Sequence, residues 1–591
     1  MIGTEKSAVF HFVMIKPSHY DDDGYVIQWA RSYIPSNTLA TLYGLALDCV
    51  ERRVLGDAVE IKLSAYDETN TRINVKKIIK QIQQSGGRGL IGLVGVQSNQ
   101  YPRAMDLGRQ FRAAGLPVCI GGFHVSGCLA MLPEVPQDLQ EAMELGITLF
   151  AGEAEGRLEA LFQATYRNEL KPLYNYMNDL PGLEGLPVPY LPAAQIKRIA
   201  GARTSFDAGR GCPYLCSFCT IINVQGRKSR YRAASDVERI VRANIAQGIT
   251  SFFISDDNFA RNQDWEKIFD RLIRLREVES LKLKVIIQVD TMCHKIPHFI
   301  EKAARAGVNR VFIGLENINP EALTGARKGQ NRITEYRVML QAWHNVSITT
   351  YAGYILGFPT DTPETIARDI EIIKRELPID LLEFFILTPL PGSADHKKLH
   401  ERGVAMDPDM NNYDVTHVTT AHPQMSAEEW LDIYRRAWDI YYSPEHVETL
   451  LRRARARGAK PRGMMKKLVG FYGFYKCEKL HPLEGGFFRR KYRRDRRPGM
   501  PLENPIIFYC RYGWETLSKY TRFLGMIWRY QRIRRRVEKD TSAYTDLALT
   551  PMQGNELETL GMFNTTPAAK ATVQKALHRQ APRPKARESN S

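Results

Sequence analysis

The chain has 591 residues, more than one hydrophobic core serves, so two or three domains are expected. Its 44% hydrophobic and 25% charged content is that of a globular protein, which excludes a largely disordered or membrane-spanning chain. The net charge of +17 is concentrated after residue 452. Such basic runs attract nucleic acid, an anionic membrane or an acidic partner, although a solvated basic face explains them equally well.

No stretch reaches the ~20 apolar residues of a membrane-spanning helix, and the N-terminus lacks the pattern of a secretory signal. A cytoplasmic location is therefore expected. The nine cysteines are odd in number and thinly scattered apart from one cluster, which excludes a disulfide framework.

Residues 1–166 alternate between strand and helix patterns, which predicts an α/β domain with a Rossmann-like, doubly wound parallel sheet. Its strands are expected at 8–17, 58–67, 89–96, 116–122 and 147–153. Such sheets bind ligands beyond the carboxyl ends of their strands. Residues 167–202 are rich in Pro and Gly and are predicted to form a linker.

A second alternating block covers residues 203–425. Its strands are expected at 203–209, 251–257, 283–290, 310–316, 350–358 and 382–390. Six strand–helix units rather than eight indicate a partial, open (βα)6 barrel that resembles a TIM barrel, with its site at the strand ends.

The remainder is predicted to be a helical, basic C-terminal region over 426–545 and a disordered tail over 546–591. The segment from Ser426 to Ser443 carries Trp and Tyr at helical spacing. This stripe favours packing against the barrel over a cofactor site.

Cys212, Cys216 and Cys219 follow the first barrel strand with the spacing C-x3-C-x2-C. Structural zinc takes four ligands, and the sequence offers no second pair of Cys or His residues nearby. Three thiolates in one short loop instead suit a 4Fe–4S cluster whose fourth iron stays open for a substrate or cosubstrate.

This loop, placed after the first of six strand–helix units, resembles that of the radical S-adenosylmethionine (SAM) enzymes, with Phe218 in the aromatic position of the motif. The resemblance implies that Cys212, Cys216 and Cys219 hold the cluster and that the open iron binds the amino and carboxylate groups of SAM. It also implies that cleavage of SAM gives a 5'-deoxyadenosyl radical, which takes hydrogen from the substrate.

Later strand ends resemble the branch of this family that carries an N-terminal cobalamin domain. The resemblance implies SAM contacts for Phe218, for Asp256 and Asp257 near the methionine end, and for Gly357 and the backbone of 387–389 near the adenine. Glu316 would lie near the ribose or the substrate. Acidic residues at strand ends also serve as helix N-caps, so a structural role stays open for each.

In the first domain, the same resemblance implies that Ser98, Gly121 and Gly122 make room for the nucleotide tail of cobalamin. A Gly-Gly pair is also ordinary turn chemistry. The D-x-H-x-x-G signature that ligates cobalt is absent. His19 stays a candidate ligand, although a solvent-facing loop histidine is favoured. His124 is expected to pack beside the nucleotide tail or to cap the next helix.

With both cofactors, the architecture suggests methyl transfer to an unactivated carbon, that is, a radical SAM C-methyltransferase. A cobalamin-dependent cyclisation or rearrangement without methylation is the first alternative. The alternative of a different class is a non-catalytic, zinc-stabilised binding protein.

The expected partners are a small-molecule or lipid substrate and an external electron donor such as a flavodoxin or ferredoxin. Residues 523–539 would allow peripheral contact with an anionic membrane, although a helix packed on the barrel with a solvated basic face is favoured. Nucleic acid is disfavoured, because the chain lacks the cysteine-bearing N-terminal domain of the methylthiotransferases. Cys293 is expected to be a buried, inert thiol.

Overall fold

The computed structural model describes residues 8–551 and 559–580. The N-terminal domain is a six-stranded parallel sheet with the order β3-β1-β4-β5-β6-β7. Its strands are β1 (Ala8–Lys16), β3 (Val59–Asp67), β4 (Gly89–Leu93), β5 (Val118–Gly121), β6 (Thr148–Ala151) and β7 (Leu173–Asn175). β7 lies inside the predicted linker, where α7 (Ala193–Ile196) also forms.

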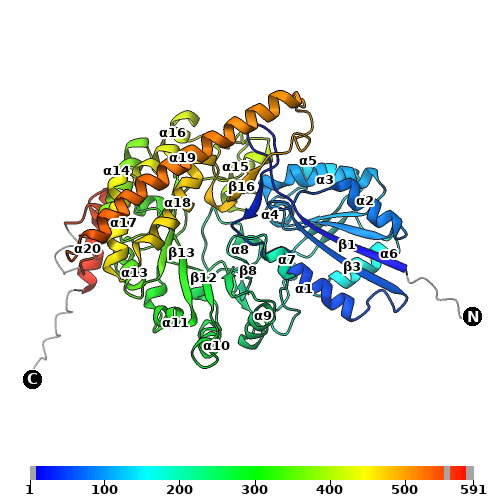
Figure 1. Cartoon of the computed structure of the whole chain (residues 1–591), viewed down its shortest axis with the longest axis horizontal. Coiled ribbons are helices and arrows are strands. Elements are labelled where there is room, and N and C mark those ends of the chain that lie inside the picture. Colours follow the sequence, from blue (N-terminus) through cyan, green and yellow to red (C-terminus); the bar gives the residue numbers. More distant parts are fainter. Residues whose placement is uncertain (1–7, 552–558, 581–591) are drawn as a thin grey trace, which may run out of the picture.

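Helices cover both faces of this sheet (Figure 1). α1 (Asn37–Glu51) and α6 (Leu158–Tyr166) pack on one face. The other face carries α2 (Val75–Gln84), α3 (Tyr101–Ala113), α4 (Phe123–Met131) and α5 (Gln137–Glu144).

The alternation of side chains along β1 explains these two layers. Phe10 and Phe12 point into the core beneath α1 and α6, whereas Val13 and Ile15 join the core on the opposite face. Successive side chains of a strand point to opposite faces, so a continuous apolar run specifies a strand that is buried on both sides.

The second domain is an open barrel of six parallel strands in the sequential order β15-β14-β13-β12-β11-β8. The strands are β8 (Arg203–Phe206), β11 (Ser251–Ile254), β12 (Lys284–Val289), β13 (Val308–Glu316), β14 (Thr349–Leu356) and β15 (Leu381–Ile386). The fold class predicted from the sequence, a doubly wound sheet followed by a partial barrel, is confirmed.

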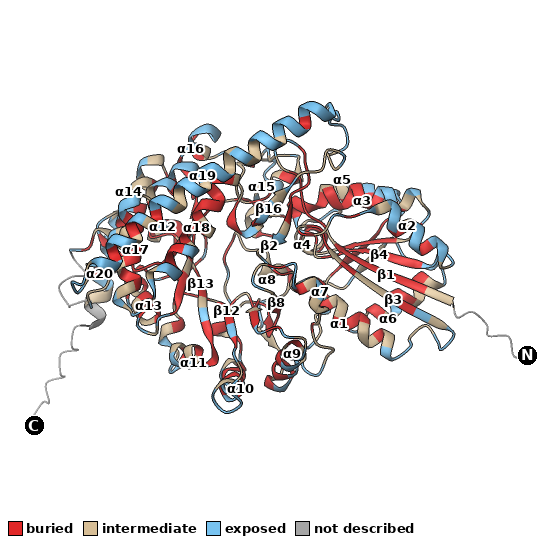
Figure 2. Cartoon of the chain, viewed as in Figure 1, coloured by how far each residue is buried: buried red, intermediate tan, exposed pale blue. Residues whose placement is uncertain are grey.

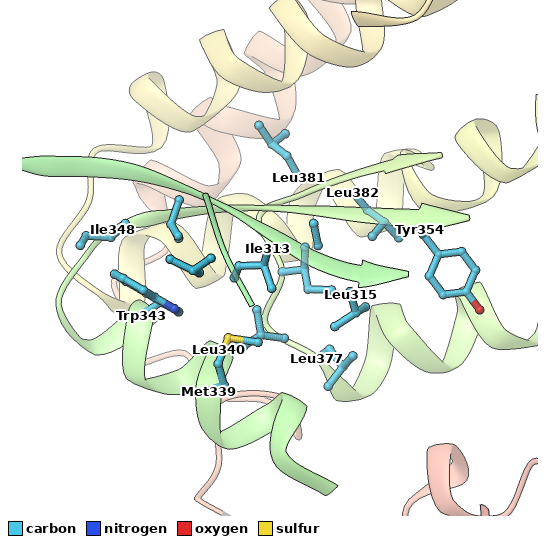
Figure 3. Packing of buried hydrophobic residues seen from close by; sticks show 14 of the residues in the cluster. Ile313, Leu315, Met339, Leu340, Trp343, Ile348, Tyr354, Leu377, Leu381 and Leu382 are labelled. Atoms are coloured by element: carbon cyan, nitrogen blue, oxygen red, sulfur yellow. The ribbon is translucent and has the colours of Figure 1, made fainter. Parts of the chain in front are cut away.

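Helices surround the barrel strands (Figure 1). They are α9 (Ala234–Ala246), α10 (Trp265–Glu277), α11 (Phe299–Ala306), α12 (Pro320–Gly325), α13 (Ile333–Asn345), α14 (Pro363–Glu376) and α15 (Ala394–Glu401). Figure 3 shows Ile313 and Leu315 of β13 on the same side as Leu340 and Trp343 of α13. Because these four side chains are buried in one apolar cluster, α13 holds β13 in place from outside the barrel.

The C-terminal helices extend this core. They are α16 (Ala427–Tyr441), α17 (Pro444–Ala456), α18 (Pro461–Glu478) and the long α19 (Pro505–Lys539). Trp430, Tyr434, Trp438 and Tyr441 of α16 are buried in the barrel core, so the interpretation of the aromatic stripe as packing is confirmed. β16 (Gly486–Arg490) returns to the first domain and pairs antiparallel with β2 (Gln28–Ser32).

The prediction of a disordered tail is wrong for the residues that the structure describes after 545. Residues 567–580 form α20 (Pro567–Gln580), and Leu560, Met562 and Phe563 are buried against the barrel core. The Glu376 carboxylate accepts hydrogen bonds from the backbone N–H of Gly561 (2.8 Å) and Met562 (2.9 Å). The tail predictions for 552–558 and 581–591 lie outside the described residues.

Across the described ranges, every helix is too short or too polar to cross a lipid bilayer.

Candidate functional site

The three cysteines lie on one loop between β9 (Gly209–Arg210) and α8 (Ile221–Val224). Cys216 is buried, Cys212 and Cys219 are partly exposed, and none of them forms a disulfide. The loop is closed at its base, where the Cys212 N–H donates to the Gly226 carbonyl at 3.2 Å. Gly211 has φ +87° and a Cβ there would lie 2.7 Å from the Lys228 carbonyl oxygen, so only glycine fits this turn.

The donor set suits an iron–sulfur cluster better than zinc. Within the described part of the chain, no three His, Cys, Asp or Glu side chains converge as they would around one metal ion. A zinc site requires four donors on a single ion, whereas a 4Fe–4S cluster distributes its thiolates over separate irons. The three thiols therefore fit the cluster, and the geometry does not support the zinc-stabilised alternative.

Buried polar groups surround these thiols. The Gln330 side-chain N–H donates to Cys216 Sγ at 3.4 Å, and the Lys328 ammonium lies 5.6 Å from the centre of the Phe218 ring. Burial raises the pKa of Cys212 to about 11 and that of Cys219 to about 12 in the metal-free chain. A bound metal ion deprotonates such thiols outright.

Glu316 ends β13 with a left-handed backbone, φ +61°, beside a register shift in the ladder to β14. Its carboxylate forms an ion pair with Lys328, which is buried, whereas Glu316 is partly buried. A non-glycine residue in this conformation persists only where its surroundings hold it. The structure thus brings Glu316 next to the cysteine loop through Lys328.

Asp256 and Asp257 follow β11 and play different parts. Asp256 is buried and accepts hydrogen bonds from the Ala208 N–H (2.7 Å) and from Asn262 (2.9 Å), so it anchors the strand that leads into the cysteine loop. Asp257 is partly exposed and its charge acts on Cys212 and Cys219. Burial raises the pKa of each carboxyl to about 7.

Gly357 ends β14 with φ +104°, and a Cβ there would lie 1.9 Å from Trp430 Cζ2. The Asp361 carboxylate accepts the N–H groups of Gly357 and Phe358, each at 2.9 Å, and so fixes this turn. Phe358 in turn lies 6.5 Å from Phe218, ring centre to ring centre.

Apolar side chains line the same strand ends. They form one cluster that consists of Phe218, Ile355, Phe358, Phe385, Leu387 and two alanines of the segment 322–326. The cluster lies apart from the outer core and includes the aromatic residue of the cysteine motif. Phe218, Gly357 and Leu387, predicted separately, are therefore neighbours in the fold.

In the N-terminal domain, a cavity opens at the carboxyl ends of β4, β5 and β6. Gly121 and Gly122 line it, together with Gly95 and Glu153. The far wall is formed by Arg210, Val224 and Gln225, which flank the cysteine loop. The cavity of the first domain thus faces the loop of the second.

Close packing requires a glycine at position 122, which the sequence alone did not reveal. Its φ is +150°, and a Cβ would lie 2.2 Å from the backbone nitrogen of Val96. Gly121 would place a Cβ 3.2 Å from the Phe150 carbonyl oxygen. Both glycines let adjacent strand ends approach each other, and both also border the cavity.

Ser98 is buried and does not line this cavity. Its Oγ lies 3.2 Å from His124 Nδ1, and His124 Nε2 lies 2.9 Å from the Asp138 carboxylate. The structure therefore places Ser98 with His124 rather than with the two glycines.

His19 is buried, which corrects the expectation of a solvent-facing histidine. Its Nε2 forms an ion pair at 2.9 Å with the carboxylate of Glu484, a residue of the C-terminal region. The carboxylates of Glu484 and Asp414 outweigh burial and raise the pKa of His19. Cys293 is fully buried, in agreement with an inert thiol.

Arg210, which sequence reasoning missed, connects the two domains. Its guanidinium donates to Glu153 (2.7 Å) and Glu155 (2.6 Å) of the first domain and to Asp207 (3.1 Å) of its own. Burial raises the pKa of Asp207, but Arg210 and Arg232 outweigh it and lower the pKa to about 2. The sequence signal that could have revealed this contact was the acidic pair Glu153 and Glu155 at the end of the fifth predicted strand.

Known proteins resemble the chain in the same regions. Residues 208–373 match the model of the radical SAM superfamily. The bacteriochlorophyllide d C-8(2)-methyltransferase of Chlorobaculum tepidum is 25% identical over 359 residues, covering 57% of this chain and 74% of the relative. The hopanoid C-2 methylase of Rhodopseudomonas palustris is 26% identical over 348 residues, covering 58% of this chain and 63% of the relative.

Two solved structures share the fold. The methyltransferase TsrM from Kitasatospora setae, with cobalamin and a [4Fe-4S] cluster bound, has a TM-score of 0.55 at 15% identity and covers 78% of this chain and 99% of its own. OxsB, a cobalamin-dependent radical enzyme, has a TM-score of 0.51 at 14% identity and covers 96% of this chain and 84% of its own.

The chain thus contains a radical SAM domain over residues 208–373. The two relatives are named as a methyltransferase and a methylase, and the chain shares its fold with a methyltransferase solved with cobalamin bound and with a cobalamin-dependent radical enzyme.

Proposed function

We propose that this enzyme is a cobalamin-dependent radical SAM C-methyltransferase. Cys212, Cys216 and Cys219 would hold the 4Fe–4S cluster, and the cavity at the ends of β4, β5 and β6 would hold cobalamin. When bound, the cluster and SAM supply a 5'-deoxyadenosyl radical that takes hydrogen from the substrate, and cobalamin supplies the methyl group. The observation that carries the proposal is that Arg210, Val224 and Gln225 line the cavity of the first domain from the side of the cysteine loop.

The residues of the chain hold these groups in place. Lys328 puts a buried positive charge beside Cys216, and Gln330 donates a hydrogen bond to its sulfur. Hydrogen bonds and charge near the sulfurs are the means by which a protein tunes a cluster's reduction potential. Phe218, Phe358 and Phe385 exclude water from the same strand ends.

For SAM, we propose contacts from Phe218, Asp257, Glu316 and Gly357, with Asp256 positioning the loop from behind. For cobalamin, Gly121 and Gly122 border the cavity, and Ser98 is the least supported of the predicted residues because its hydroxyl is engaged with His124. Of the domain boundaries predicted from the sequence, those at 202 and 425 remain part of this proposal. The boundary at 166 moves, because β7 extends the first sheet, and the boundary at 545 moves, because described residues after it pack on the barrel core.

The substrate is a small molecule, and the apolar cluster around Phe385 suits one with an apolar surface, such as a lipid. We propose an external electron donor, a flavodoxin or ferredoxin, and a cytoplasmic location with peripheral contact at a membrane.

Methyl transfer is tested by incubating the anaerobically reconstituted protein, containing iron, sulfide and hydroxocobalamin, with SAM labelled with deuterium in its methyl group and an apolar extract of the source cells. The proposal expects a corrin absorbance that stays with the protein on gel filtration and a product that carries the labelled methyl group. A product without the label would favour a rearrangement, and loss of the corrin would remove cobalamin from the account.

A further inference from the structure

α19 is attached along one face and open along the other. Phe508, Tyr530, Ile533 and Val537 are buried against the protein, and Lys519 forms an ion pair with Glu478 of α18 at 2.8 Å. These contacts span the helix, so it cannot roll to hide its outer side. Figure 2 shows that outer side as exposed, along the edge of the molecule.

Large apolar side chains occupy the open face. Neighbours in this set lie three, four or eight residues apart, which places them on one side of a helix. We call this set the outer stripe: Ile506, Trp514, Leu517, Tyr520, Leu524 and Trp528. Ile506 is 74% exposed, Trp514 71% and Trp528 57%. At 1.5 Å per residue the outer stripe is about 33 Å long.

β16 adds to the outer stripe. Phe487 is 47% exposed and Phe488 is 65% exposed, and the Phe488 ring lies 6.1 Å from that of Tyr520. Phe488 is held outward by a left-handed backbone, φ +57°. Contiguous exposed apolar side chains of this extent mark a site of interaction rather than ordinary surface.

The exposed charge beside the outer stripe is mostly positive. Exposed basic residues of α19 are Arg511, Arg522, Arg529, Arg532, Arg535, Arg536 and Lys539. The structure describes the whole of α19, and Glu538 is the sole exposed acidic residue in it. The Arg532 guanidinium lies 3.6 Å from the centre of the Trp528 ring. Trp and Tyr beside Arg and Lys are typical of surfaces that lie at a membrane interface.

The buried side of α19 explains why the sequence pattern favoured a helix packed on the barrel over a helix at a membrane. A free interfacial helix is apolar on one side and polar on the other. α19 is apolar on two opposite sides, one for the protein and one for its surroundings, so its amphipathic pattern is weak although its exposed side is apolar.

A second copy of the chain is the competing occupant of this surface. Two-fold pairing through α19 would bring the same basic residues of both copies together. Arg511 and Arg536 are paired with Glu503 and Glu448, but the other exposed basic residues still outnumber Glu538. Like charges at an interface are unfavourable, whereas anionic headgroups neutralise basic residues near the surface. Charge complementarity therefore favours the bilayer.

We propose that the outer stripe, with Phe487 and Phe488, docks the enzyme on an anionic lipid bilayer. The apolar side chains enter the headgroup region, and the arginines on their flank contact lipid phosphates. This proposal deepens the peripheral membrane contact proposed above. The surface contains none of the three cysteines, so failure of bilayer docking and failure of the proposed chemistry are distinguishable.

The test is co-sedimentation of the full chain with vesicles of phosphatidylcholine, alone or mixed with phosphatidylglycerol. We expect binding to the mixed vesicles that weakens at high salt and falls about tenfold or more in the double variant Leu517→Glu, Leu524→Glu. The matched control, Val278→Glu with Val338→Glu, adds the same charge at exposed apolar positions of other helices and should bind like the wild type.

A measurement on the unaltered backbone guards against misfolding. Trp514 and Trp528 should shift to shorter emission wavelengths and be quenched by brominated phosphatidylglycerol, and the conservative variant Trp514→Phe, Trp528→Phe should lose that response. Absence of vesicle binding by the wild type overturns the proposal. So does equal binding by the stripe and control variants, or a dimer in light scattering that the stripe variant alone dissolves.

Discussion

Arg210 Nη1 donates to Glu153 Oε2 at 2.7 Å, and both side chains are 8% exposed. Arg210 lies two residues before Cys212, and Glu153 follows β6, so this contact joins the cysteine loop to the cavity of the first domain. The distance between the two proposed cofactor sites therefore depends on a buried ion pair.

Replacing Arg210→Gln should destabilise the protein strongly. The change leaves the buried carboxylate of Glu155 without its cation and Asp207 with Arg232 alone, and breaking a buried pair in this way costs about 3–5 kcal/mol. The control Arg52→Gln breaks the exposed contacts to Asp48 and Glu159 and should change stability little. Thermal unfolding of the two variants compares them, and equal shifts would contradict the role of Arg210.

Gly357→Ala should distort the end of β14. The φ of +104° and the 1.9 Å approach to Trp430 leave no room for a methyl group, and backbone strain of this kind costs about 1–3 kcal/mol. Gly463→Ala is the matched control, because α18 leaves that position open and alanine favours a helix. SAM binding by calorimetry, with thermal unfolding, should show loss for Gly357→Ala alone.

Glu383 should make stability depend on pH. Its carboxyl is buried in β15, Glu383 Oε2 has no hydrogen-bond partner within the described chain, and burial raises the pKa from 4.5 to about 8. The folded state thus keeps a proton that the unfolded state releases above about pH 4.5, so stability falls as pH rises from there to about 8 and then levels off.

Glu383→Gln removes this dependence. The unfolding free energy of the variant minus that of the wild type, obtained from thermal unfolding, should therefore grow between pH 5 and pH 8. The increase is up to about 1.4 kcal/mol per pH unit. His481, whose Nε2 lies 3.9 Å from the Glu383 carboxylate, stays neutral over this window because burial lowers its pKa to about 3. A difference that does not change with pH would show that the Glu383 carboxyl titrates normally.

Glu376→Ala should release the segment that begins at Leu560. The variant removes the acceptor of the Gly561 and Met562 N–H groups, so their hydrogen exchange should accelerate by about tenfold or more. Glu371→Ala, an exposed neighbour on α14 paired with Lys374, is the control. Unchanged exchange at Gly561 in the Glu376 variant would mean that other contacts hold the segment.

Local patterns predicted the six barrel strands, because most of them, such as β12 and β14, are largely apolar and are followed by polar or glycine residues. The short edge strands escaped. β2 and β16 are defined by pairing between residues far apart, such as Trp29 with Arg489, and no local pattern announces it. The same holds for His19 and Glu484, and for the capping of Gly561 by Glu376.

The site residues also divide into those that a local motif identifies and those that only the fold brings together. Cys212, Cys216 and Cys219 form a local motif and were found together. Lys328 and Arg210 were missed because their functions depend on Glu316 and Glu153, which only the fold brings near. Gly122 was identified for its position, but its tight contact with Val96 is a packing requirement that the motif alone does not express.

The central claim is that the three cysteines support SAM cleavage. The most direct measurement is 5'-deoxyadenosine formation by the anaerobically reconstituted protein with dithionite and SAM, in the wild type, in Cys216→Ala and in the control Cys49→Ala, which alters a buried thiol of α1. The account predicts 5'-deoxyadenosine and cluster absorbance in the wild type and Cys49→Ala, and neither in Cys216→Ala. A wild-type protein that holds zinc, lacks cluster absorbance and forms no 5'-deoxyadenosine would contradict it.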